Sequence, residues 1–178
     1  MEKLEWQKIN CLQDKIRIML PKEWERPSSE ILEKKFPYRT KPQEVFADLQ
    51  ENRIITCSLL DKPLQESQIY PAITEIQRVI VHIYPESIKE QAKIFTITSG
   101  KAGFFSFITG GITEDYCNNI FILSIDEKMM IGNYCLPIGQ LQEGRKILMD
   151  ILNSIEIKRE SKENGIFRHN YNGASKKI

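Results

Sequence analysis

The pattern of apolar residues between positions 102 and 155 predicts three strands followed by a helix. Apolar stretches of this length, separated by turn residues, are typical of β-strands. The first connection contains Gly110-Gly111 and the second contains Asp126-Glu127. The middle stretch is apolar on both faces, so both faces of the sheet need cover. The three expected strands are 102–108, 118–125 and 129–137.

Two segments repeat apolar residues at helical spacing and are therefore expected to be amphipathic helices. The first runs from Ile69 or Pro71 to Tyr84, since proline is tolerated in a first helical turn. The second is Leu141–Ile155, where Gly144 on the apolar side could let the helix approach the sheet closely. The two stripes consist of Ile69, Ala72, Ile73, Ile76, Ile80 and Ile83, and of Leu141, Leu148, Ile151, Leu152 and Ile155.

The remaining elements are expected in the first hundred residues. Lys15–Leu20 is expected to be the first strand, because Ile16, Ile18 and Leu20 alternate and Pro21 follows. Ser28 or Ser29 could cap a short helical turn that stops at Pro37. A loop is expected over 61–67, and further strands over 44–49, 53–60 and 94–98.

These elements predict an α+β fold, an antiparallel β-sheet of about six strands sandwiched by helices. The chain has 178 residues, of which 41% are hydrophobic and 28% are charged. This length and composition suit one soluble domain with a substantial core. We place that single domain at residues 1–157.

The segment 158–178 is expected to be a basic, flexible tail. It holds six basic and two acidic residues, so it carries about +4 within a formal net charge of +1. A basic tail can touch nucleic acid or anionic lipid. A solvated, frayed terminus is the favoured interpretation, and no nucleic-acid partner is expected.

Targeting signals are not evident in the sequence. The N-terminal residues lack the apolar run and the cleavage site of a secretory signal. The longest apolar run is far shorter than the roughly 20 residues that a membrane helix needs. We therefore expect a cytoplasmic protein with no membrane insertion.

The four cysteines, Cys11, Cys57, Cys117 and Cys135, show no metal-ligand spacing and no histidine beside them. If Asp126-Glu127 forms a two-residue turn, Cys117 pairs with Leu136 and Cys135 pairs with Asn118. The two thiols then project from opposite faces of the sheet, so no disulfide joins them. Reduced thiols acting as small core residues are the favoured interpretation.

Nucleophilic catalysis would need a base beside a serine, cysteine or threonine. The histidines are His82, at the boundary of its helix's apolar stripe or in solvent, and His169, in the expected tail. A flexible tail cannot hold a base with the accuracy that catalysis requires. We therefore expect no catalytic residue, cofactor site or metal site in this chain.

Carboxylate pairs and glycines give no stronger signal. Glu114-Asp115 and Asp126-Glu127 lie at opposite ends of the strand 117–125, about 30 Å apart at ~3.4 Å per residue. That separation is too long for glycosidase geometry. Gly110-Gly111 lacks the lysine and the following helix of a phosphate-binding loop, so a hairpin bend is expected.

Six stretches of the chain resemble bacterial PsbP-like or DcrB-like (Mog-type) domains, and together they cover roughly residues 15–157. The resemblance implies an antiparallel sheet flanked by helices, and a binding or accessory role rather than a shared catalytic site. Related sequences tend to carry Asp-Gly at the turn where this chain has Asp126-Glu127, which favours a longer loop here. The stretches are 18–24, 35–46, 104–107, 112–118, 121–126 and 130–135.

The function expected from these observations is a non-enzymatic protein-interaction domain, acting as a chaperone or adaptor. Its partner would be another protein, such as a secreted effector, and homodimerisation through an edge strand is an option. The alternative is a small-molecule or lipid-binding protein with a pocket between the sheet and the helix 71–84. Trp24 is interpreted as a core residue rather than a ligand platform, whereas a partly exposed Trp6 could anchor a partner.

Overall fold

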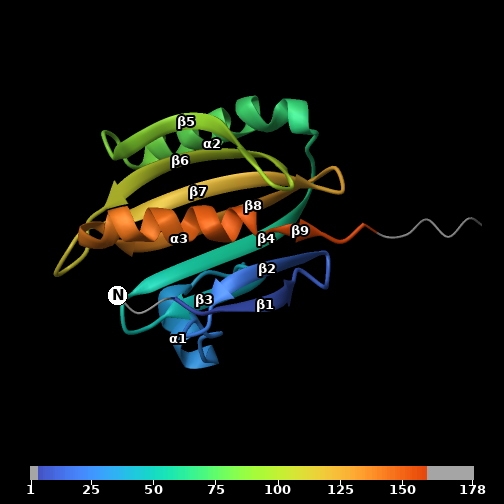
Figure 1. Cartoon of the computed structure of the whole chain (residues 1–178). Helices are drawn as coiled ribbons and strands as arrows, with labels where there is room; N and C mark the ends of the chain where they lie inside the picture. Colours follow the sequence, from blue (N-terminus) through green and yellow to red (C-terminus); the bar gives the residue numbers. More distant parts are fainter. Residues whose placement is uncertain (1–3, 160–178) are drawn as a thin grey trace, which may run out of the picture.

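The computed structural model describes residues 4–159 (Figure 1). Within this range, nine strands form two sheets, accompanied by three α-helices and two short 3₁₀ helices. The predicted basic tail lies outside the described residues, except for Lys158 and Arg159. The boundary between domain and tail therefore stays a prediction.

The larger sheet has six strands, and every neighbouring pair is antiparallel. This confirms the predicted α+β class and the predicted sheet of about six strands. In spatial order the strands are β3 (Glu44–Asp48), β4 (Arg53–Pro63), β8 (Lys128–Pro137), β7 (Tyr116–Ile125), β6 (Gly100–Thr109) and β5 (Ile88–Ile97).

A second, smaller sheet was not predicted. It consists of β1 (Trp6–Cys11), β2 (Ile16–Pro21) and β9 (Glu156–Ile157), in the order β1-β2-β9. β2 matches the expected first strand, but the segment that contains Trp6 is itself a strand. Leu12, Gln13 and Asp14 all have positive φ in the β1–β2 turn, a backbone conformation that usually selects glycine. The sequence carries no glycine at these positions, so it did not indicate a turn between two strands.

Helices cover both faces of the six-stranded sheet, as the two-sided apolar pattern predicted. α2 (Ile69–Ile83) packs on β5, β6 and β7 from one side, and α3 (Leu141–Asn153) packs on β8 and β2 from the other (Figure 1). The short 3₁₀ helices η1 (Glu66–Gln68) and η2 (Ile138–Gln140) lead into α2 and α3. α1 (Ser29–Lys35) is capped by the Ser28 hydroxyl, which accepts a hydrogen bond from the Ile31 N–H.

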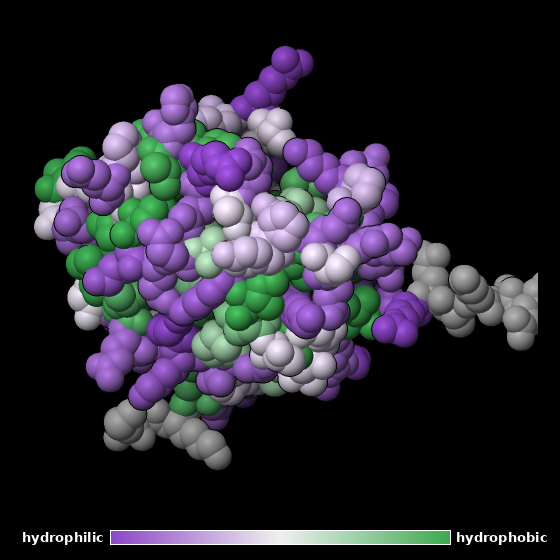
Figure 2. Space-filling view, turned by 90° about the horizontal axis from the view of Figure 1, so that it is seen from above, coloured by the Kyte–Doolittle hydropathy of each residue, from purple (hydrophilic) through white to green (hydrophobic). Residues whose placement is uncertain are grey.

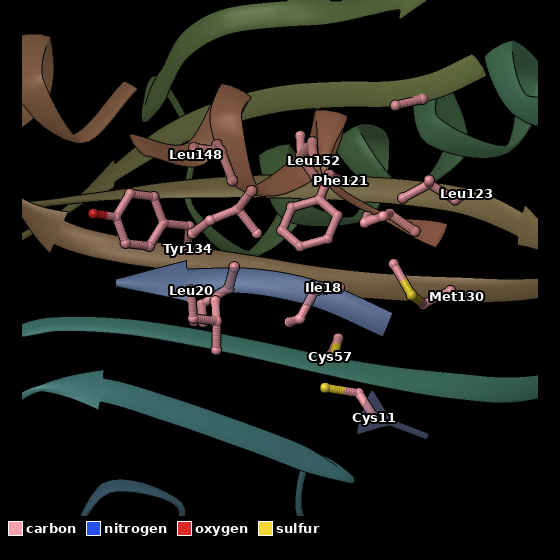
Figure 3. Close-up of a cluster of buried hydrophobic side chains, with 14 of the residues drawn as sticks. Cys11, Ile18, Leu20, Cys57, Phe121, Leu123, Met130, Tyr134, Leu148 and Leu152 are labelled. Atoms are coloured by element: carbon pink, nitrogen blue, oxygen red, sulfur yellow. The ribbon is translucent and has the colours of Figure 1, made fainter. Parts of the chain in front are cut away.

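The main core lies between the six-stranded sheet, α3 and the small sheet. Phe121 and Tyr134 of the large sheet pack there against Leu148 and Leu152 of α3 (Figure 3). Cys11 and Cys57 lie next to each other where the two sheets meet (Figure 3). On the opposite face, a separate cluster joins α2 to the sheet and contains Leu64, Ile69, Ile73, Phe105, Phe107, Ile120 and Ile122.

The register of the central hairpin agrees with the prediction. Cys117 faces Leu136 and Cys135 faces Asn118 across β7 and β8. The expectation of a longer loop is wrong, because Asp126 and Glu127 adopt positive φ angles of 48° and 61° and make a two-residue turn. The pairing of two ten-residue strands stabilises this turn by more than the positive φ angle of Glu127 costs.

Several boundaries differ from the expected ones. β4 continues to Pro63, whose partner is Lys128, after an irregularity that follows Leu59. The expected loop 61–67 therefore begins as strand. β5 begins at Ile88 rather than 94, because its polar first half still pairs with β6. α3 ends at Asn153, two residues before the predicted end, where Ser154 caps it.

Candidate functional site

The α2 side of the six-stranded sheet is covered only in part. α2 packs on β5, β6 and β7, whereas the alternate residues of β4 and β8 on the same face stay half-buried. The period of two along a strand explains this pattern. Ile55 and Cys57 point into the core under α3, so Ile54 and Thr56 point to the opposite, open face.

A groove runs along this open half of the sheet. It consists of two adjoining hollows of about 410 Å³ and 330 Å³, which share Phe36, Thr56 and Asn133. Its wall is the segment 36–42 that follows α1, and its floor is β4, β7 and β8. We call it the sheet groove; its floor residues are Ile54, Thr56, Ser58, Leu60, Asn118, Ile120, Ile131, Gly132, Asn133 and Cys135.

The floor of the sheet groove mixes apolar side chains with hydrogen-bonding ones. The Asn133 amide donates to Asn118 Oδ1 over 3.0 Å, and the Asn118 amide donates to Thr109 Oγ1 over 3.0 Å. Asn133 Oδ1 is buried and accepts no hydrogen bond from any described residue. The groove floor therefore contains an unused acceptor, buried beside apolar surface.

The charged residues that line the sheet groove are both lysines, Lys35 and Lys41. Lys41 makes an ion pair with Glu33 of α1. Lys35 stands at the last turn of α1 and has no ion-pair partner among residues 4–159. One end of the groove thus carries an uncompensated positive charge.

The prediction of free thiols acting as small core residues agrees with the structure for Cys11, Cys57 and Cys117, but not for Cys135, which lies outside the core. All four thiols are free; Cys11, Cys57 and Cys117 are buried, and Cys135 is half-buried on the groove floor. Burial raises the pKa of Cys11 to about 12 and that of Cys135 to about 11, and it also raises the pKa values of Cys57 and Cys117. Each thiol is therefore protonated, and a poor nucleophile, at neutral pH.

The structure does not bring the other titratable residues of interest together. His82 is exposed on α2, and His169 lies outside the described residues. Glu114 and Asp115 are exposed in the β6–β7 loop, at the opposite end of β7 from Asp126-Glu127. Between residues 4 and 159, no three His, Cys, Asp or Glu side chains converge as they would around a metal ion.

Gly110 and Gly111 form part of a hairpin connection, as predicted. A Cβ atom at Gly111 would lie 2.3 Å from the Glu114 carbonyl oxygen, so the loop closes too tightly for a side chain. Trp24 is buried, and its ring centroid lies 5.6 Å from that of Tyr134, which places it in the core. Trp6 is partly buried and packs against the same core.

Two arginines that attach α3 to the sheet were not identified from the sequence. Arg53 of β4 has a side chain only 7% exposed and donates to Gln140 and to Glu143. Arg145 of α3 binds Glu90 and stands over the Phe104 ring, 4.0 Å from its centroid. The sequence does not indicate that these two arginines are buried or half-buried, because the carboxylates that pair with them, Glu143 and Glu90, are distant in the chain.

Another hollow, of about 630 Å³, opens beside Trp24 and Arg53. Four of the five carboxylates around it already have partners: Glu5 binds Lys22, Glu51 accepts from Gln140, Glu143 binds Arg53, and Asp48 accepts from two backbone N–H groups of its own turn. The fifth, Glu23, is an exposed surface residue. Because most of these carboxylates already serve as structural groups, the sheet groove is the stronger candidate site.

Comparison with known proteins identifies the fold of this chain. No family model and no curated protein sequence matches the chain. Its structure is similar to cyanobacterial PsbP (CyanoP) from Synechocystis sp. PCC 6803, with a TM-score of 0.58 and 10% identity over 89% of this chain and 95% of that one. This is the PsbP/Mog1-like fold.

Two other solved structures agree. The Ran-binding protein Mog1p of Saccharomyces cerevisiae matches with a TM-score of 0.51 and 9% identity, covering 87% of this chain and 96% of that one. LpqN of Mycobacterium tuberculosis, involved in cell envelope biogenesis, matches with a TM-score of 0.52 and 11% identity over 89% and 93%. The PsbP-like fold that the sequence resemblance implied is confirmed.

Among the described residues, no helix combines the length and the apolar character needed to span a bilayer. Seen from the side of α2 and β5, apolar and hydrophilic side chains alternate over the surface (Figure 2). α2 itself has four exposed apolar residues, three of them close together near its C-terminal end. They are Tyr70, Val79, Val81 and Ile83.

Proposed function

We propose that this chain is a non-enzymatic interaction domain that holds an extended segment of another protein in the sheet groove. The observation that carries the proposal is the open half of the sheet, where Ile54, Leu60 and Ile131 stay half-buried because α2 packs chiefly on β5, β6 and β7. Protein-binding surfaces combine an apolar centre with hydrogen-bonding groups. A chaperone or adaptor acting on a secreted effector is the specific role that we favour.

The dimensions of the groove favour a peptide. From Ile54 to Leu60, β4 spans about 20 Å at ~3.3 Å per residue, the length of an extended segment of six or seven residues. Thr56, Ser58 and Asn133 present hydrogen-bonding side chains along this path. Small-molecule sites usually enclose 70–90% of their ligand, whereas this groove is open along its length.

A non-enzymatic role is supported by the state of the reactive side chains. The thiols have raised pKa values, and the exposed His82 lies on α2, away from the groove floor. Mog1p, which has the same fold, is a Ran-binding protein. Binding to a protein partner would give this chain the same class of function as Mog1p.

The alternative of a ligand pocket between the sheet and α2 has less support. Ile69 and Ile73 are fully buried there against the sheet. A Cβ atom at Gly103 of β6 would lie 2.9 Å from atoms of both isoleucines. The helix therefore packs directly on the sheet at this point.

Homodimerisation through an edge strand also has less support. The edge strand β5 carries exposed Lys89 and Lys93, and its pairing with β6 is interrupted twice. Lysines and irregularities on an edge hinder pairing with a second strand. The other edge strand, β3, is bridged by Glu25, which exchanges two backbone hydrogen bonds with Ala47.

Peptides selected from a random displayed library test the proposal. We expect selected peptides to shift the backbone amide resonances of β4 and β8 around Thr56 and Asn133. Thr56→Trp should fill the groove and abolish binding, while the matched variant Thr96→Trp, on the exposed side of β5, should bind normally. Peptides that bind Thr56→Trp as well as the natural chain would refute the proposal.

A further inference from the structure

We infer that the sheet groove selects partner segments that carry an acidic side chain beside apolar residues, and that Lys35 binds this acidic side chain. The inference rests on the proposed function and adds the chemistry of the partner. It depends on the charge of the groove rather than on its shape.

The charge distribution around the groove is one-sided. Both charged lining residues are lysines, and no carboxylate lines either hollow. The acidic residues of α1 are already engaged, since Glu30 pairs with Lys34 and Glu33 pairs with Lys41. Lys35 is left without an ion-pair partner among residues 4–159, so its charge is available to a bound molecule.

The position of Lys35 defines which part of a partner it meets. Lys35 lines the same hollow as Asn52, Ile54 and Cys135, and its charge acts to lower the pKa of the Cys135 thiol against the larger effect of burial. The opposite end of the groove, around Leu60 and Ile131, is mainly apolar. A segment with a carboxylate at one end and apolar side chains along the rest matches this order.

The other residues that line the hollow with Lys35 include no carboxylate that could cancel its charge. The polar ones among them include Thr109, Tyr116 and Asn118. Glu114 and Asp115 precede Tyr116 in the chain, but they are exposed and do not line the groove. Within the described chain, the groove therefore favours an anionic partner over a cationic one.

A fatty acid would also offer a carboxylate beside apolar groups, but the floor favours a peptide. Thr56, Ser58, Asn118 and Asn133 lie along it, and Asn133 Oδ1 lacks a donor. Ser58, Asn118 and Asn133 already take part in hydrogen bonds, whereas the Thr56 hydroxyl makes none within the described residues. An alkyl chain would cover that hydroxyl without a hydrogen bond, which costs free energy. A backbone group of an extended peptide can bond to it.

Synthetic peptides with a common core of alternating Ile and Thr, flanked at both ends by Glu, by Gln or by Lys, test the inference. We expect the Glu peptide to bind about two- to fivefold more tightly than the Gln peptide at low salt, because a solvent-exposed ion pair contributes up to ~1 kcal/mol. The Lys peptide should bind most weakly. Fluorescence anisotropy measures the affinities, and amide shifts in β4 and β8 locate the binding.

Variants separate Lys35 from the rest of the molecule. Lys35→Gln should remove the preference for the Glu peptide, and Lys35→Glu should reverse it in favour of the Lys peptide. The matched control Lys34→Gln removes a charge from the same helix outside the groove and should keep the preference. The preference should also fade at high salt, because exposed charges are screened.

The outcomes distinguish this inference from the proposed function. Equal binding of the Glu and Gln peptides, with amide shifts in β4 and β8, would overturn the charge selection and leave the peptide groove intact. Peptides that bind without shifting these amides would overturn both. Oleate that shifts the groove amides where no peptide does would also overturn both, in favour of a lipid.

Discussion

At the scale of single residues, the interior of the protein depends on a few glycines that let other groups approach. Gly144 was expected to bring its helix close to the sheet, and the packing agrees. A Cβ atom there would lie 2.1 Å from Leu136 Cδ1, and Leu136 is fully buried. The leucine side chain has no free space into which it could move.

Replacement of Gly144 by alanine should therefore destabilise the protein, although alanine is the better helix former by about 1 kcal/mol. Overpacking of a core typically costs about 1–3 kcal/mol. Because the Cβ atom would approach Leu136 so closely, we expect the upper part of this range and, after the gain in helix propensity, a net loss of about 1–2 kcal/mol. Chemical denaturation measures the free energy of unfolding. Gly139→Ala is the control, because a Cβ atom at Gly139 meets nothing within 4 Å. Equal stability of the two variants would contradict the packing argument.

The buried thiols predict a dependence of stability on pH. Burial raises the pKa of Cys11 to about 12, from an ordinary value of 9.0, and Cys57 shifts in the same direction. The folded protein thus keeps protons that the unfolded chain releases above pH 9. The free energy of unfolding is unaffected below pH 9 and falls above it, by up to about 1.4 kcal/mol per pH unit for each thiol.

Cys57→Ala isolates one of these thiols. Its stability should fall less steeply than that of the natural chain between pH 9 and 10.5, by up to about 1.4 kcal/mol per pH unit at the upper end of this range, whatever the cost of the lost side chain. Denaturation curves in the presence of a reductant measure the slopes. Parallel pH profiles would show that Cys57 does not keep its proton in the folded state.

At the scale of secondary structure, the periodic segments were predictable and the irregular ones were not. The stripes of α2 and α3 and the register of β7 and β8 follow from the hydrophobic pattern, because burial on one or two faces leaves a period in the sequence. β1 has only Trp6, Ile9 and Cys11 as apolar residues, and the two-residue β9 is too short for any period.

The short helix α1 has no buried residue, so its own terminal hydrogen bonds decide how often it opens. Ser28→Ala should remove the cap and cost about 1 kcal/mol of local helix stability. We expect faster hydrogen exchange at Leu32 and Phe36, whose N–H groups bond to Ser28 and Leu32, without a change in the midpoint of thermal unfolding. Ser29→Ala, at an exposed position that makes no cap bond, should exchange normally. Faster exchange throughout β7 would contradict a local effect.

At the scale of the whole molecule, the fold was predictable but the candidate site was not. The expected strand 53–60 carries apolar side chains on both faces, which favours cover on both; they are Ile54, Ile55, Cys57, Leu59 and Leu60. One face of β4 is instead half-exposed, because α2 extends over β5, β6 and β7 and does not reach β4. The placement of a helix across a sheet depends on the connections and on packing between distant elements, and neither leaves a local pattern.

The division into a compact domain and a basic tail predicts the behaviour of a truncated chain. Deletion of residues 160–178 removes four basic and two acidic residues and changes the formal net charge from +1 to −1. The two core clusters lie within residues 4–159, and Lys158 still donates its N–H to the Lys15 carbonyl. We therefore expect the midpoint of thermal unfolding and peptide binding in the groove to stay unchanged.

The same pair of chains tests the interpretation of the tail. Sequence-independent binding to DNA weakens steeply with salt, in proportion to the number of phosphates that basic residues neutralise. Titration of a DNA duplex at two salt concentrations should show weak and similar binding for the full chain and for the truncated one. Tight, salt-dependent binding by the full chain alone would make the tail a nucleic-acid contact. A lower unfolding midpoint after truncation would place the end of the domain beyond residue 159.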